Sequence, residues 1–302
     1  ALPIFQTAGV PSMRLNIGAN GTTGTLGTGP VIINGDGANG ILGFDRSDGY
    51  TLAAGQTLTG AGSNLTRTFI DVDTRGTGLS QNGQTITLGD AGPLLGGQLR
   101  IAQGRAGSIL NTNGVVTTEQ LRVSTGQTGG VLNINAGSAI SANAFNLGEI
   151  ANGSATVNQA AGSSVSVVGQ LRLGHFGTET GIYNLNGGTI TLTGDSPNLS
   201  PSTAAAGGAN ATGDNNINAL PANTIVGGGI YLGIDGNGIF NHSSGSVTTN
   251  WIVLDNRGNT GAGANMATGI DEYNLNAGTQ LLIGEEGTGF LNVSASGTVS
   301  NA

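Results

Sequence analysis

A short alternation of an apolar residue, any residue and another apolar residue returns seven times along this chain. The first residues of successive copies are 22, 24, 26, 59, 22 and 29 residues apart. Because residues i and i+2 of a strand point to the same face, the outer two residues of each copy are expected to form one apolar core row. The copies are Leu99-Arg100-Ile101, Leu121-Arg122-Val123, Phe145-Asn146-Leu147, Leu171-Arg172-Leu173, Ile230-Tyr231-Leu232, Ile252-Val253-Leu254 and Leu281-Leu282-Ile283.

A second motif recurs between these copies, in which an apolar residue precedes Asn and a Gly follows a few residues later. Stacked Asn side chains can hydrogen-bond amide to amide along a fibre-like axis, and the Gly is expected to mark a corner with positive φ. The motifs are Leu110-Asn111 before Gly114, Leu132-Asn133 before Gly137, Val157-Asn158 before Gly162, Tyr183-Asn184 before Gly188, Phe240-Asn241 before Gly245, Tyr273-Asn274 before Gly278, and Leu291-Asn292 before Gly297.

Together the two motifs predict an all-β fold, a right-handed parallel β-helix (β-solenoid) with roughly 22–26 residues per coil. Of the 302 residues 57 are Gly and only 9% are charged, but 37% are hydrophobic. Disordered chains are usually charged and poor in β-branched residues, so this chain is expected to fold. One elongated domain is expected because a repeat fold grows in one dimension.

The repeat is regular over residues 96–302 and degenerate over 1–95, which we interpret as an irregular or capping N-terminal part of the same solenoid. A segment rich in Pro, Ala, Asn and Gly at 194–228 is predicted to be a loop insertion, and 258–269 a smaller one. Candidate strands in the N-terminal part are 31–33, 57–58, 68–72 and 85–88.

Charge and composition exclude several classes of partner. The net charge is −8 and all nine basic residues are Arg, whereas nucleic-acid binding needs a concentrated basic face. No run of 18 apolar residues exists, so no membrane span is expected, and without Cys there is no disulfide. No cofactor is expected. The chain begins at Ala1 without Met, from which we expect a mature product after signal removal.

The residue between the two core positions of each tripeptide is expected to point outward. In chain order this row changes from basic to apolar, and we interpret it as a candidate interface formed by Arg100, Arg122, Arg172, Tyr231, Val253 and Leu282. The Arg residues suit an acidic glycan or a neighbour's carboxylates. The N-terminal arm with Leu2, Ile4 and Phe5 is a candidate for pairing with a neighbour's sheet, and we expect an uncapped C-terminal coil to invite similar pairing.

Asp71 and Asp73 are the strongest candidates for chemistry, because two residues apart on a strand they share a face, beside Arg75. The pair is compatible with a calcium site or with the acids of a glycan-cleaving β-helix. The simpler interpretation is a solvated outer face with a local ion pair, and it is the one we favour.

Other motifs point to structure. The stretch 35–41 partly matches the calcium-binding nonapeptide of β-rolls, but it occurs once and is predicted to be a turn. His175 and His242 occupy non-equivalent positions and lack Cys partners, so a transition-metal site is not expected. No nucleophile motif of the Gly-x-Ser-x-Gly type lies in a strand-to-helix context. We therefore expect no enzymatic activity.

Units such as Gly181-Ile182-Tyr183-Asn184-Leu185-Asn186-Gly187-Gly188 resemble the β-strand repeats of bacterial autotransporter passengers and related surface proteins. The resemblance covers roughly residues 95–302, is one of repeat style, and implies an extracellular or cell-surface location. The translocating barrel of that family is missing from this sequence. The leading hypothesis is a secreted structural protein that self-associates into a filament, sheath or matrix. The alternatives are an adhesin that binds polysaccharide or a host surface along the rod and, less favoured, a glycan lyase or hydrolase.

Overall fold

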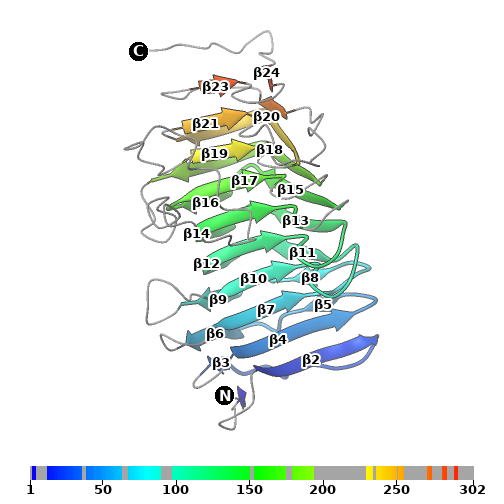
Figure 1. The fold of residues 1–302 in the computed structure, drawn as a ribbon. Helices are drawn as coiled ribbons and strands as arrows, with labels where there is room; N and C mark the ends of the chain where they lie inside the picture. Colours follow the sequence, from blue (N-terminus) through cyan, green and yellow to red (C-terminus); the bar gives the residue numbers. More distant parts are fainter. Residues whose placement is uncertain are drawn as a thin grey trace, which may run out of the picture.

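The computed structural model describes residues 2–4, 12–35, 39–62, 67–89, 97–149, 153–174, 179–193, 229–233, 236–249, 251–254, 271–273, 281–283 and 289–291. These residues form 24 strands and no helix. Every strand pairing is parallel, and the strands pile up along one axis from the N-terminal to the C-terminal end (Figure 1). The predicted all-β parallel β-solenoid is therefore confirmed.

Three columns of strands make up the faces of the solenoid. Face A is the column that contains the repeated tripeptides. It runs through β2 (Ser12–Gly21), β4 (Asn39–Arg46), β7 (Thr68–Val72), β10 (Gln98–Ile101), β12 (Val115–Val123), β14 (Ala139–Leu147), β17 (Gln170–Leu173), β19 (Gly229–Leu232), β21 (Trp251–Leu254) and β23 (Leu281–Ile283).

Face B carries the Asn motif and face C the strands that follow each corner Gly. Face B consists of β5 (Tyr50–Thr51), β8 (Leu79–Ser80), β11 (Ile109–Thr112), β13 (Gly130–Ile134), β15 (Ser154–Ala160), β18 (Thr180–Leu192), β20 (Asn237–Thr248), β22 (Asp271–Tyr273) and β24 (Gly289–Leu291). Face C consists of β1 (Leu2–Ile4), β3 (Val31–Gly35), β6 (Thr57–Gly62), β9 (Thr85–Leu88), β16 (Ser164–Val167), the first halves of β12 and β14, and the ends of β18 and β20.

The N-terminal strands continue the same ladders. Leu15 pairs with Leu42, Leu42 with Ile70, and Ile70 with Leu99, so the first residue of the tripeptide continues to the start of the rod. These steps are 27, 28 and 29 residues long, longer than the period over the regular part of the chain. The candidate strands near 31, 57, 68 and 85 are confirmed, and β2, β4, β5 and β8 are strands that the sequence pattern missed.

The expected insertions at 194–228 and 258–269 lie outside the described residues, as do Phe5, His175 and the last residues of the chain. Residues 36–38 of the candidate nonapeptide do so too; they connect β3 to β4.

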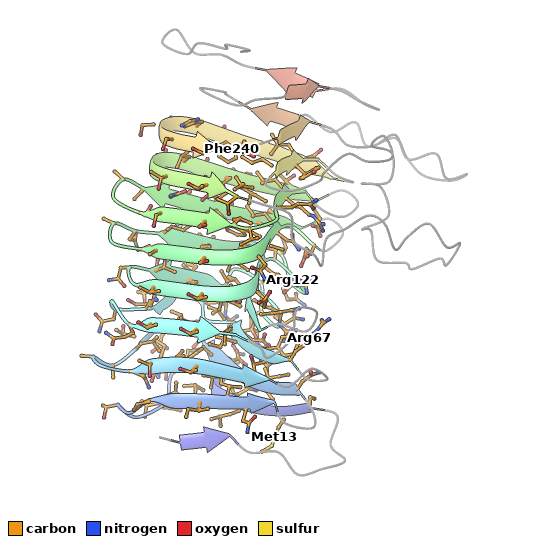
Figure 2. All side chains as sticks on the ribbon, turned by 90° about the vertical axis from the view of Figure 1, so that its left-hand side faces the viewer. Met13, Arg67, Arg122 and Phe240 are labelled. Atoms are coloured by element: carbon orange, nitrogen blue, oxygen red, sulfur yellow. The ribbon has the colours of Figure 1, made fainter. Side chains whose placement is uncertain are left out.

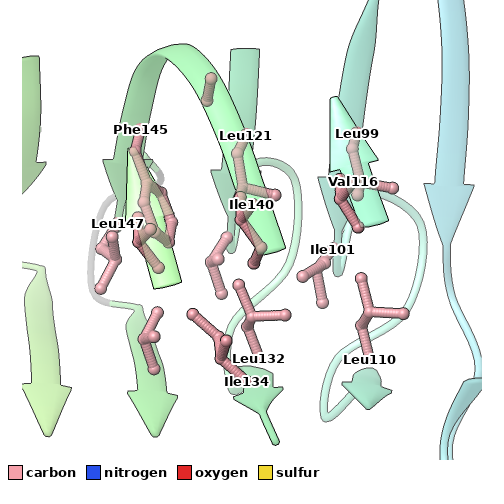
Figure 3. Close-up of a cluster of buried hydrophobic side chains, with 14 of the residues drawn as sticks. Leu99, Ile101, Leu110, Val116, Leu121, Leu132, Ile134, Ile140, Phe145 and Leu147 are labelled. Carbon is pink, nitrogen blue, oxygen red and sulfur yellow. The ribbon is translucent and has the colours of Figure 1, made fainter. Parts of the chain in front are cut away.

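The core is the stack of apolar rows from the three faces (Figure 3). On face A the inward residues of successive strands, such as Leu99, Leu121 and Phe145, have no exposed surface. On face B, Leu132 and Ile134 on either side of the Asn position are equally buried. The inward rows predicted from the i, i+2 alternation are therefore confirmed. Burial of such side chains stabilises a fold by about 25 cal/mol per Å² of apolar surface.

The Asn side chains of face B form a continuous ladder. The amide Nδ2 of Asn133 donates to Oδ1 of Asn111 at 2.8 Å, and the same bond recurs from Asn158 to Asn133, from Asn184 to Asn158 and from Asn241 to Asn184, at 2.8–2.9 Å. The predicted amide stacking is confirmed. Each amide both donates and accepts, so the ladder holds the coils in register along the rod.

The corner glycines have two different causes. Gly188, like the equivalent glycines of most coils, has positive φ (83°), as expected. Gly114 is not among the positive-φ residues; there a Cβ would lie 2.4 Å from the carbonyl oxygen of Gln84 in the coil below. The expectation of positive φ is therefore wrong at Gly114, where close approach of two backbones requires Gly instead.

Candidate functional site

The middle residues of the face A tripeptides form one continuous row on the outside of the ladder. In order along the rod they are Asn16, Gly43, Asp71, Arg100, Arg122, Asn146, Arg172, Tyr231, Val253 and Leu282, each paired in register with the next. We call this set the middle row. Charged side chains gather in it and at the corner beside it, and Arg122 is seen about half-way along the rod (Figure 2).

The middle row is much less exposed than the sequence suggests. Arg100 and Arg122 are half-buried, but Arg172 is only 3% and Tyr231 only 1% exposed. The expected exposed strip is therefore wrong at these two positions. The reason is that both side chains lie back along their own strand: Nε of Arg172 donates to Gln170 at 2.6 Å, and a Cβ on Gly229 would lie 2.8 Å from the Tyr231 ring.

The remaining candidate interface residues have backbone positions only. Val253 and Leu282 continue the middle row, but their side chains lie outside the described residues. Leu2 and Ile4 belong to β1, which pairs with Val31 and Ile33 of the same chain. Pairing of this arm with a neighbouring molecule stays a prediction.

Asp71 is the centre of a buried ion-pair network. Its carboxylate has no exposed surface, and Arg100 of the next coil grips it with two bonds, Nε to Oδ1 at 2.6 Å and Nη2 to Oδ2 at 3.0 Å. Arg14, two coils below, binds Oδ2 through Nη1. The guanidinium carbon of Arg100 also lies 4.0 Å from the centre of the Phe69 ring. Two cations therefore share one buried carboxylate.

Asp73 joins the same network from the next position on that face. Its Oδ2 accepts from Nη2 of Arg14 at 3.2 Å, and its Oδ1 accepts from the backbone N–H of Gly104 at 2.6 Å. Burial raises the pKa of Asp73, the N–H of Gly104 opposes this, and the charge of Asp71 adds to the rise. Asp71 and Asp73 share a face as predicted, but the expected solvated pair beside Arg75 is wrong. Both are buried, and Arg75 contacts Asn20 instead.

A second, more exposed pair lies at the adjacent corner. Nε of Arg105 donates to Oδ1 of Asp45 at 3.1 Å, and the Arg105 side chain is 41% exposed. Exposed ion pairs contribute little to stability. Arg105 and Asp45 are therefore the solvent-exposed counterpart of the buried pair formed by Arg100 and Asp71.

Further along the rod, Arg122 binds a carboxylate from the coil above. Its Nε donates to Oε2 of Glu149, and its Nη1 donates to Oε1 of Gln98 at 3.2 Å. Oε1 of Glu149 accepts from Nδ2 of Asn146 at 2.9 Å. The Arg122 guanidinium is therefore engaged within the chain, as that of Arg100 is.

Glu179 is the least satisfied acid of the described residues. It has no exposed surface, and both of its carboxylate oxygens are buried without a hydrogen-bond partner. The carboxylate lies over Gly148, where a Cβ would be 2.8 Å from Oε2. Burial, with a further contribution from the charge of Glu149, raises the pKa of Glu179 to about 8. The group is therefore mainly protonated below that pH.

We expect Glu179→Gln to make the protein more stable at pH 9 than the unsubstituted chain. An acid whose pKa is raised from 4.5 in the unfolded chain to about 8 in the folded protein makes folding less favourable as the pH rises through that window. Each whole step between the folded and unfolded pKa corresponds to about 1.4 kcal/mol, so a gain on the order of 2 kcal/mol or more is expected at pH 9. The measurement is the melting temperature of both proteins at pH 4 and pH 9. Equal differences at the two pH values would contradict the assignment.

His242 does not resemble a metal ligand. Its Nε2 lies 3.2 Å from the carbonyl oxygen of Gly245, and its ring meets Phe240 edge-on with centroids 6.3 Å apart. Within the described ranges, no group of three or more His, Asp or Glu side chains is arranged to hold a metal ion. The Asp71 and Asp73 oxygens face guanidinium and backbone N–H groups, an arrangement typical of a structural ion pair.

Sequence reasoning missed Arg14, Glu149 and Glu179. Arg14 precedes Leu15-Asn16-Ile17, a further copy of the tripeptide, and allowing a step of 27 residues would have placed it beside the Asp71 coil. No comparable signal marks Glu149 or Glu179. They lie in corner segments whose paths vary from coil to coil.

Comparison of the chain with protein families, with curated proteins and with solved structures gives no match. Across the part of the chain that the structure describes, no helix is long and apolar enough to cross a membrane.

Proposed function

We propose that the protein is a structural β-solenoid subunit, secreted or displayed at a cell surface, that self-associates end to end into a filament, sheath or matrix. One observation carries this proposal. At β2 the apolar rows reach the N-terminal end of the rod, and Met13 and Leu15 are only half-buried there (Figure 2). The equivalents of Leu15 in the next coils, Leu42 and Ile70, have no exposed surface.

A second copy stacked on this end would bury Met13 and Leu15 and extend the same parallel ladder. Unpaired strand edges at sheet ends are templates for such pairing. The extracellular location rests on the similarity of the repeats to those of bacterial autotransporter passengers. Binding of an acidic glycan receives no specific support, because Arg100, Arg122 and Arg172 already bind Asp71, Glu149 and Gln170.

The test is particle size as a function of concentration. We expect the purified protein to form lengthening rods, detected by light scattering and by negative-stain electron microscopy. Leu15→Lys should shorten the rods because it places a charge on the stacking surface. Thr156→Lys, on an outward position of face B away from the end, is the matched control and should not. A strictly monomeric protein at high concentration would contradict self-association. Unchanged rods of Leu15→Lys would contradict the end-to-end route.

A further inference from the structure

The outward side chains of face C form two regular columns of small, mostly hydroxyl-bearing residues. We call them together the hydroxyl face. The first column is Thr59, Thr87, Thr117, Ser141, Ser166, Thr191 and Thr248, each paired in register with the next. The second column, two residues earlier on each strand, is Thr57, Thr85, Val115, Ala139, Ser164, Thr189 and Ser246.

From this arrangement we propose that the hydroxyl face binds ice. Neighbouring strands of a sheet lie about 4.7–4.9 Å apart, and residues i and i+2 of one strand about 6.6–6.8 Å. The hydroxyl groups therefore repeat in two directions and form a lattice that spans about 29 Å along the rod. A single small molecule cannot use such a lattice, whereas a crystal of water, which repeats in the same way, can.

The side chains of this face are open to solvent and held in place. Thr59, Thr117, Ser141 and Thr248 are exposed, and the remaining members of the two columns are exposed or half-buried. Inward residues between them, such as Val116 and Ile140, are buried in the core and fix the strands. Thr has few accessible χ1 rotamers on a strand, so little conformational entropy is lost when its hydroxyl meets an ordered partner.

Charge separates this face from the rest of the molecule. Neither column contains a charged residue, whereas Asp71, Arg100, Arg122 and Glu149 lie on face A and its corner. An uncharged lattice of alternating donors and acceptors suits water, whose surface groups are also donors and acceptors. A charged polymer would find no counter-charge here.

A second copy of the chain is the competing occupant, and the composition of the face argues against it. Protein interfaces are centred on aromatic and large apolar anchors. Among the described residues, the large apolar side chains that are well exposed are Ile32 and Val115. Burying the hydroxyl columns against protein would require a partner for every hydroxyl.

The experiment uses the full chain and measures thermal hysteresis and ice-crystal shape. We expect the unsubstituted protein to open a gap between melting and freezing points and to facet growing ice crystals. Thr117→Tyr, in the middle of the first column, raises a bulky ring above the lattice and should reduce the gap to that of a buffer control. Thr156→Tyr on face B is the matched control and should keep it. Circular dichroism and melting temperature establish that both variants fold.

Three outcomes would overturn the proposal. They are no hysteresis and no faceting by the unsubstituted protein, full activity of Thr117→Tyr, and an equal loss in Thr156→Tyr. If Thr117→Tyr instead lowers the oligomer mass without any effect on ice, the hydroxyl face contacts a second copy. Self-association through β2 is measured separately with Leu15→Lys, so the two proposals fail independently.

Discussion

Arg100→Met is expected to destabilise the protein by about 3–5 kcal/mol, because it leaves a buried carboxylate short of its main partner. Asp71 has no exposed surface, and two of its three guanidinium bonds come from Arg100. Arg14, the remaining partner, has a side chain that is 33% exposed, and it is shared with Asp73. Met keeps the length and the contact with Phe69, so the change isolates the charge. The measurement is the denaturant midpoint and the melting temperature at pH 7.

Two comparison variants make this prediction specific. Arg105→Met removes a guanidinium from an exposed pair with Asp45 and should cost less than about 1 kcal/mol. Asp71→Asn combined with Arg100→Met removes both charges and should recover most of the loss. Equal destabilisation by Arg100→Met and Arg105→Met would contradict the network. The result also bears on glycan binding, since loss of binding in an Arg100 variant has to be separated from loss of folding.

Tyr183→Ala is expected to cost about 3–5 kcal/mol by opening a cavity in the middle of the rod. The Tyr183 ring has no exposed surface, stacks on Phe240 with centroids 5.1 Å apart and meets Phe145 edge-on at 6.1 Å. Three successive coils are therefore joined through one aromatic side chain. Tyr50→Ala, which removes a half-buried Tyr beside Phe44, is the matched comparison and should cost clearly less. A similar loss in both variants would contradict the central role of Tyr183.

The hydroxyl of Tyr183 makes a separate contribution. It donates to Oε1 of Gln159 at 2.6 Å, and Nε2 of Gln159 donates to the carbonyl of Thr189 at 3.1 Å. Burial raises the pKa of Tyr183, so the phenol remains a donor at physiological pH. Tyr183→Phe should cost about 1–3 kcal/mol because a buried acceptor loses its donor. Replacing Gln159 by Leu in the same chain should recover part of that loss.

The local sequence was sufficient for the core and for the Asn ladder. Leu99, Leu121 and Phe145 alternate with outward residues at a fixed period of two, and the same tripeptide recurs one coil later. A strand converts that alternation directly into an inward row. Asn133 and Asn158 follow the same logic, since identical residues at identical positions of stacked coils meet. These features depend on sequence distances of one coil or less.

Only the tertiary structure decided which charges meet and how deeply the middle row is buried. Arg14 meets Asp71 across 57 residues, because three steps of unequal length between Leu15 and Leu99 superpose in space. Tyr231 is buried because its ring lies along its own strand over Gly229, a rotamer choice that no alternation pattern contains. The period along the chain specifies which backbone positions stack, whereas side-chain direction and coil length specify which groups touch. For that physical reason the fold was predictable and the ion-pair network was not.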